Sequence, residues 1–181
     1  GILSYRNGKG LFSREIKGSF WGESVTASLA TKQDNLSVDV NGRFSMPVLG
    51  KFLKLPSDQV LQGKTDIQAN VLVPLEDMTL PLRLTINSQL QGAVINLPEP
   101  FGKEADSQRE IAVKVTFADS LDIQVLMDES LRVHLIQKDG ALVRGSLARN
   151  SERTALPEVG AFMVTGHFEY FSLSEWQTAF S

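Results

Sequence analysis

The stretch that decides the fold is "IAVKVTFADSLDIQVLMDESLRVHLIQKDGALVRGSLA", residues 111–148. Apolar and polar side chains alternate along four segments of it, and short polar pairs such as Asp119-Ser120 and Asp139-Gly140 separate these segments. Successive side chains on a strand point to opposite faces of a sheet, so this alternation predicts strands with one apolar and one hydrated face. Asp-Gly is typical of a type I′ hairpin turn. We therefore predict a four-stranded antiparallel meander.

The same alternation recurs on both sides of the meander. One parity is apolar in residues 25–29, 36–40, 67–73 and 82–86, and again in 162–170. Antiparallel sheets have this pattern, whereas the buried strands of parallel sheets are continuous apolar runs. The predicted fold class is all-β: a mainly antiparallel, meander-rich curved sheet or sandwich-like groove, with one or two short helices.

Helices are scarce. Residues 47–53 are one candidate, with a proline in the first turn, although Gly50 weakens it by roughly 1 kcal/mol relative to Ala. The sequence Ser172-Leu173-Ser174-Glu175 matches a capping box and predicts a helix that continues to Phe180.

Two polar loops that contain proline are expected, at residues 98–109 and 150–159. The first follows Leu97-Pro98-Glu99-Pro100, where we expect a strand to end because proline has no N–H to donate to a β ladder. We interpret this interruption as a strand exit and crossover rather than as an active site.

Composition excludes several function classes. The net charge of −3 argues against a nucleic-acid partner, since such binding depends on neutralising phosphates. The absence of cysteine excludes disulfides and thiolate metal sites. The chain begins Gly1-Ile2-Leu3 without a signal peptide, which fits either a mature cytoplasmic protein that has lost its Met or a piece from the interior of a longer chain. We expect residues 1–181 to be a single β-rich segment, with 1–60 and 61–181 as candidate sub-units.

No catalytic apparatus is visible. His134 and His167 each lie on the polar parity of a strand, where we expect them to face solvent, and neither has a neighbour at metal-ligand spacing. Most carboxylates fall in turns, where short polar side chains stabilise the backbone. We predict no catalytic residue, no metal and no cofactor, and therefore no enzyme. A hydrolase with an acid pair from distant segments is the hypothesis with least support.

The apolar face has two interpretations. Two sheets can pack face to face and fill it, as in a sandwich, or one sheet can curl into a trough that leaves it open to an apolar ligand. Both predict the same alternation, and on the residues alone we favour the packed sandwich.

A family resemblance favours the trough. The segment "LRLTINSQLQGAVINLPEPFGK", residues 82–103, resembles a motif of the YhdP-type proteins in the AsmA-like superfamily. The matching positions are Ser88, Leu90, Gly92, Leu97, Pro98, Pro100, Gly102 and Lys103. The stretches "GKTDIQANVLVP" (63–74) and "VTGHFEYFSLSEW" (164–176) are similar to the strands that flank the motif in that family.

The resemblance implies a function. YhdP-type proteins are long, inner-membrane-anchored proteins of the Gram-negative envelope, with an apolar periplasmic β groove thought to move phospholipids between the two membranes and to maintain the outer-membrane permeability barrier. This chain would then be a periplasmic segment whose partners are phospholipid or acyl chains, the rest of the full-length chain and other envelope proteins. The alternative is a structural or protein-interaction β-sandwich module with no ligand.

The lipid-facing candidates are the apolar parity of three predicted strands. They are Leu82, Leu84, Ile86, Ile111, Val113, Val115, Phe117, Leu121, Ile123, Val125 and Met127. Lys103 is a further candidate, for contact with a lipid headgroup.

Overall fold

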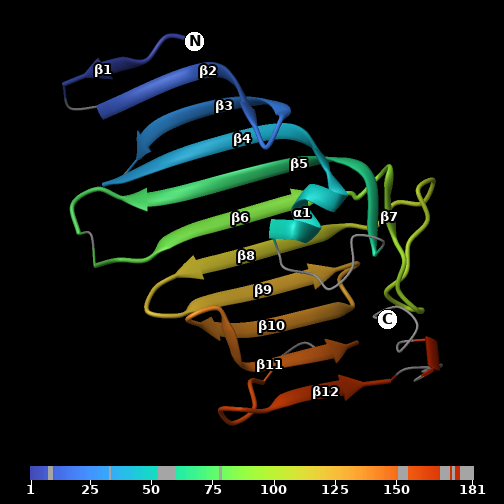
Figure 1. Cartoon of the computed structure of the whole chain (residues 1–181). Helices are drawn as coiled ribbons and strands as arrows, with labels where there is room; N and C mark the ends of the chain where they lie inside the picture. Colours follow the sequence, from blue (N-terminus) through green and yellow to red (C-terminus); the bar gives the residue numbers. More distant parts are fainter. Residues whose placement is uncertain are drawn as a thin grey trace.

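The computed structural model contains one large β-sheet and one short helix (Figure 1). The structure describes residues 1–7, 10–32, 34–52, 60–77, 79–150, 155–167, 172 and 174–175. The elements are β1 (Ser4–Arg6), β2 (Gly10–Phe20), β3 (Glu23–Lys32), β4 (Asn35–Ser45), α1 (Met46–Phe52), β5 (Leu61–Pro74), β6 (Leu82–Ser88), β7 (Ala93–Ile95), β8 (Ile111–Phe117), β9 (Leu121–Met127), β10 (Leu131–Lys138), β11 (Ala141–Arg149) and β12 (Phe162–Gly166).

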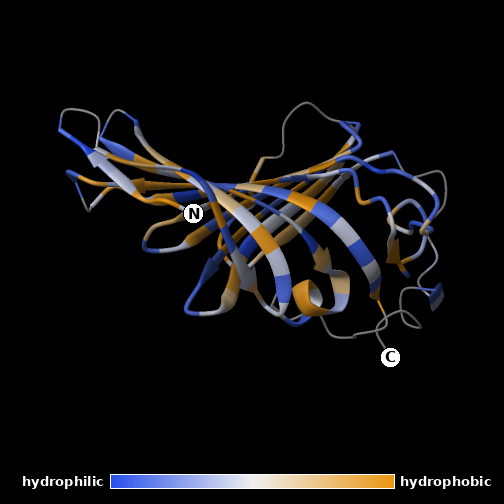
Figure 2. Cartoon of the chain, turned by 90° about the horizontal axis from the view of Figure 1, so that it is seen from above, coloured by the Kyte–Doolittle hydropathy of each residue, from blue (hydrophilic) through white to orange (hydrophobic). Residues whose placement is uncertain are grey.

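The strands follow one another across the sheet almost in chain order. The path runs from β1 to β6 and then from β8 to β12, and each neighbouring pair is antiparallel except the parallel pair β11–β12. Strand β7 leaves this path and pairs with the first residues of β5. The described strands form no second layer over the sheet, so the all-β prediction is confirmed in its curved-sheet form. Figure 2 shows the curvature, with α1 lying on one side of the sheet.

The predicted meander of residues 111–148 is confirmed as β8 to β11. Both residues of the Asp139-Gly140 turn have positive φ, 53° and 79°, as a type I′ turn requires. Asp128 and Glu129 form the preceding turn, with φ values of 49° and 58°. Local turn chemistry therefore fixes the register of these strands.

The two predicted helices have different outcomes. Helix α1 directly follows β4 and confirms the candidate that begins near Pro47. At the capping box, the Glu175 backbone N–H donates to Ser172 Oγ at 3.3 Å, as an N-cap requires. The continuation of that helix to Phe180 lies outside the described residues.

Apart from Phe44, Ile67, Leu131 and Ala148 on the sheet, the buried apolar residues of the described chain form one small cluster beside α1. This satellite core consists of Met46, Val60, Leu61, Leu90, Ala93 and Ile95. It joins α1, β7 and the beginning of β5. Leu49, Leu97, Ile111 and Met127 pack against it. The large sheet thus has a packed core at only one of its margins.

Candidate functional site: the apolar face of the sheet

The strand register places all eleven candidate residues on one face of the sheet, which we name the apolar face. Residues directly opposite each other in an antiparallel pair point to the same side. The rows are Leu82, Phe117 and Leu121; Leu84, Val115 and Ile123; Ile86, Val113 and Val125; and Ile111 with Met127.

The apolar face extends well beyond the predicted residues. Two of its rows continue through β5, β4 and β3 on one side and through β10 and β11 on the other. The added residues are Leu29, Val38, Val71 and Leu135 in one row, and Ala27, Val40, Ala69, Val133 and Leu147 in the other. Their alternation was visible in the sequence, but a pattern along one strand does not say which strands lie side by side.

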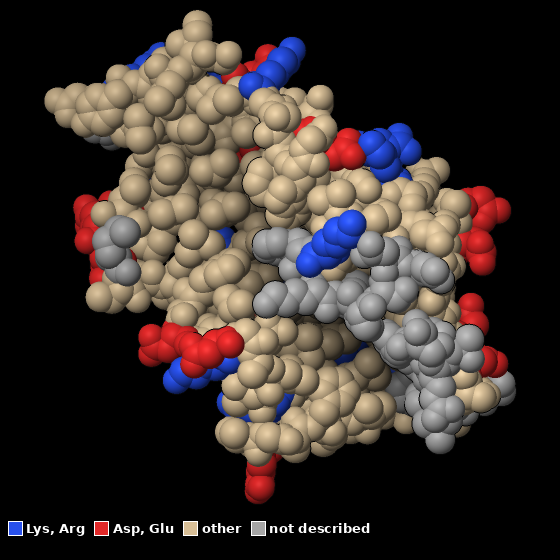
Figure 3. Space-filling model, in the orientation of Figure 1, with Lys and Arg blue, Asp and Glu red and all other residues tan. Residues whose placement is uncertain are grey.

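These rows are only half-buried. Phe117 is 39% exposed and the other ten candidates are intermediate between buried and exposed, whereas Ala93 in the satellite core is fully buried. Figure 3 views the side of the sheet that carries α1, and there uncharged residues cover most of the surface while acidic and basic residues gather mainly toward the margins. The described residues therefore leave much of this apolar surface uncovered.

One margin of the apolar face is covered. Ile111 and Met127 pack against the satellite core, and their row continues to Leu131, which is 5% exposed. The row at the opposite ends of the same strands contains Phe117, at 39%. The apolar face is thus buried along the margin beside α1 and more exposed along the opposite margin.

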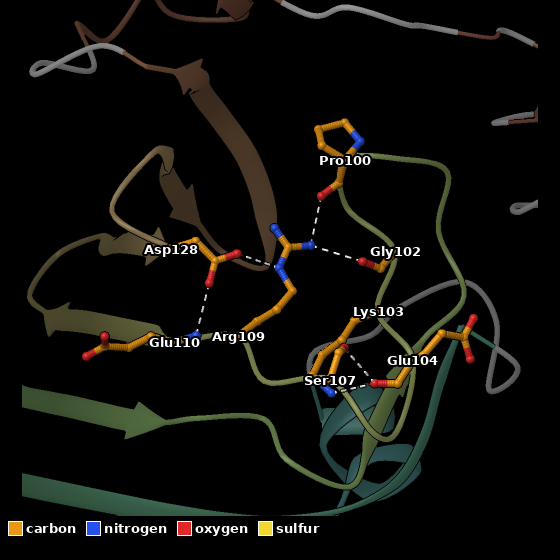
Figure 4. A network of polar contacts seen from close by, with 8 residues as sticks. All are labelled: Pro100, Gly102, Lys103, Glu104, Ser107, Arg109, Glu110 and Asp128. Atoms are coloured by element: carbon orange, nitrogen blue, oxygen red, sulfur yellow. Dashed lines mark hydrogen bonds and ion pairs between the residues drawn. The ribbon is translucent and has the colours of Figure 1, made fainter.

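The buried side chain of Lys103 holds the loop that leads from β7 to β8 by hydrogen bonds to backbone carbonyls. This residue is 5% exposed, and its ammonium donates to the backbone carbonyl of Ala93 at 2.9 Å. It also donates to the backbone carbonyl of Glu104 at 2.7 Å (Figure 4). Its backbone also exchanges two hydrogen bonds of 2.9 Å with Ile95. Burial lowers the pKa of the Lys103 ammonium below its ordinary value of 10.5, with a smaller contribution from the Arg109 charge. Because this ammonium is held inside the loop, the expected headgroup contact is not supported.

Arg109 ties the same loop to the meander. Its Nη1 donates to the carbonyls of Pro100, at 2.8 Å, and Gly102, at 3.0 Å, and its Nε contacts Asp128 Oδ2 at 2.5 Å (Figure 4). The other carboxylate oxygen of Asp128 accepts the Glu110 backbone N–H at 3.1 Å. These contacts agree with the prediction that the proline-containing interruption is a strand exit and crossover. We name Lys103, Arg109 and Asp128 the loop anchor.

The opposite face is hydrated. It contains a shallow concavity of about 430 Å³ lined mainly by Ser28, Asp39, Asn41, Gln68, Asn70 and Asn87. His134 lies on this face too, but it is not solvent-facing as expected: its side chain is 17% exposed, and its Nε2 lies 3.1 Å from Asp122 Oδ1. His167 is exposed, as predicted.

The described residues contain neither a metal site nor a membrane-spanning helix. No group of three or more acidic, histidine or cysteine side chains there could hold a metal ion. No helix in the same part of the chain has the length and apolar character that a membrane span requires.

A model of the YhdP protein family matches residues 1–181, the whole chain. The chain belongs to the YhdP family. No curated protein and no solved structure gives a significant match. Family membership is consistent with a location in the cell envelope, and it agrees with the resemblance found in residues 82–103.

Proposed function

We propose that this YhdP-family chain is a segment of a periplasmic groove that conducts phospholipids between the inner and outer membranes. The observation that carries the proposal is the apolar face, whose rows cross the sheet from strand to strand and remain partly exposed. The strands from β2 to β12 span roughly 43 Å at ~4.8 Å per spacing. Acyl chains can lie along such a surface.

Shape, rather than a reaction, performs the proposed function. Each buried methylene contributes about 0.8 kcal/mol, so the two tails of a phospholipid would be held well by an apolar wall. A row without charged side chains offers a tail no strong barrier to sliding between adjacent strands. We therefore propose a lipid carrier and not an enzyme, with the loop anchor as its structural support.

Native mass spectrometry and lipid extraction of the purified chain test this proposal. We expect phospholipid or detergent to remain bound after purification, and phospholipid to displace detergent. The matched control is a variant with aspartate in two central rows, Val113→Asp with Ile123→Asp, which we expect to lose the lipid. A chain that binds no phospholipid at any tested concentration would contradict the proposal and favour a structural module without a ligand.

A further inference from the structure

The hairpin between β2 and β3 has an unusual residue at its tip. Trp21 and Gly22 form a two-residue turn with φ values of 52° and 81°, the type I′ geometry. The first position of this turn favours Asn, Asp or Gly, and Asp139 occupies the corresponding position in the two-residue turn between β10 and β11. A left-handed backbone costs roughly 1–2 kcal/mol in an ordinary L-residue, and a bulky side chain there is rare. Strained residues of this kind cluster at functional sites.

The Trp21 ring belongs to an aromatic group on the apolar face. It stacks on Phe20 with ring centroids 4.4 Å apart, and Phe20 meets Phe44 edge-on at 6.5 Å. In the β2–β3 register, Phe20 has the same parity as Gly18, the partner of Val25, and so points to the apolar side. We name Phe20, Trp21 and Phe44 the aromatic corner.

The outer rings of the aromatic corner are only partly shielded. Phe44 is 7% exposed, but Phe20 is 50% and Trp21 is 40% exposed. Stacking contributes about 0.5–1.5 kcal/mol, which is no larger than the backbone strain at Trp21. Asparagine would form the same turn without that strain. A large aromatic surface remains exposed at this corner.

A polar pair beside the corner indicates which part of a ligand it fits. Glu23 lies opposite Phe20 in the hairpin, and its carboxylate binds Lys64 Nζ at 2.8 Å. The corner thus marks a boundary between apolar and polar surface. Indole rings suit such boundaries, because they combine a large apolar area with one N–H donor.

We propose that Phe20 and Trp21 grip a phospholipid where its acyl chains meet its headgroup, at the β2 end of the apolar face. The inference rests on the proposed function and adds a specific contact to it. The acyl chains continue from the corner onto the rows of the apolar face. Trp21 contacts their first methylenes, and the polar pair lies on the headgroup side.

Fluorescence quenching by brominated lipid tests the contact. The chain has two tryptophans, so Trp176→Phe leaves Trp21 as the only indole. The probe is phosphatidylethanolamine with bromines early in one acyl chain, compared with the same lipid without bromine. We expect the brominated lipid to reduce Trp21 emission at least twofold. The control reporter is Val113→Trp in a chain that also contains Trp21→Asn and Trp176→Phe.

The two reporters separate the hypotheses. Quenching at Trp21 supports the grip. Quenching only in the Val113→Trp reporter overturns the proposed contact at Trp21 but still supports lipid binding on the apolar face. Quenching at neither, with no lipid detected by mass spectrometry, overturns both.

A stability comparison excludes a purely structural role for Trp21. We expect Trp21→Asn to shorten lipid retention at least threefold without lowering Tm, because it relieves the strained turn. Asp139→Asn, in the same turn type, should leave both retention and Tm unchanged. A fall in Tm of more than ~4 °C in Trp21→Asn, or unchanged lipid retention, would overturn the proposal.

Discussion

Val113→Asp is the most direct perturbation of the apolar face. Val113 lies in the middle of β8, between Ile86 and Val125 in its row, and it is half-buried. A fully buried valine contributes about 1.5–3 kcal/mol, so roughly 1–2 kcal/mol is at stake for a side chain that is only partly exposed. The lower β propensity of aspartate adds up to ~1 kcal/mol. The expected cost to folding is therefore about 2 kcal/mol.

That cost should leave the protein folded. In chains of this size, 1 kcal/mol corresponds to roughly 2–4 °C in Tm, so Val113→Asp should lower Tm by about 4–8 °C. Ile95→Asp is the contrasting variant, because Ile95 is 8% exposed in the satellite core and an unpaired carboxylate there adds a large desolvation penalty. We expect it to cost more than ~5 kcal/mol.

The effect on lipid binding should be larger than the effect on folding. If the carboxylate keeps ~3 methylenes away from the wall, the loss is about 2.4 kcal/mol, or roughly fiftyfold in affinity. The matched control is Thr85→Asp, which adds the same charge on the opposite face, across from Lys114. The lower β propensity of aspartate should cost up to ~1 kcal/mol here as well, and lipid binding should be unchanged.

Thermal denaturation and a titration with phosphatidylethanolamine measure both quantities. The reasoning is refuted if Val113→Asp unfolds the chain as Ile95→Asp does, since the apolar face would then be a packed core. It is also refuted if Val113→Asp binds lipid as tightly as Thr85→Asp does.

Three further predictions concern the framework. Lys103→Met should cost about 1–3 kcal/mol by leaving buried carbonyls unpaired. Burial depresses the pKa of Lys103 in the folded state, so the folded protein loses this proton at a lower pH than the unfolded chain does. As the pH rises toward 10.5, the wild type should therefore gain stability relative to Lys103→Met. Paired Tm measurements over this pH range check the difference. Arg109→Ala should cost about 2–3 kcal/mol and speed hydrogen exchange in the loop, whereas Asp128→Asn, which removes only a partly exposed ion pair, should cost ~1 kcal/mol or less. Gly145→Val should cost about 1–3 kcal/mol because a Cβ there meets the Phe162 ring at 2.7 Å, and Phe162→Ala should recover most of that loss in a double-mutant cycle.

The sequence predicted the antiparallel strands of the sheet better than the pairing of β12 and the turn at Trp21. Alternation and turn residues are local signals, so the meander from 111 to 148 and the helix near Pro47 followed from them directly. The parallel pairing of β12 did not, because it depends on the path of the preceding connection rather than on the strand itself. The turn at Trp21 was missed for a related reason: tryptophan is not a turn signal, and only the backbone geometry reveals one.

Two features of the site could not be predicted from residue patterns. Whether the apolar face is open or packed depends on what lies over it, and a strand has the same alternation in both cases. The burial of Lys103 was equally hidden. A lysine in a polar loop is normally solvated, and its burial is acceptable here only because the Ala93 and Glu104 carbonyls replace water around the ammonium.

The loop anchor gives a physical reason why the apolar face can remain open. A sheet with an exposed apolar face would ordinarily gain stability by packing that face against something else. Here the strand ladders satisfy the backbone, and the satellite core with Lys103 and Arg109 supplies packing and hydrogen bonds at one margin. These contacts, which lie outside the central rows of the apolar face, therefore supply much of the stability of the fold. Under the proposed function, residues such as Val113 and Ile123, which are partly exposed, are then left for contact with a lipid.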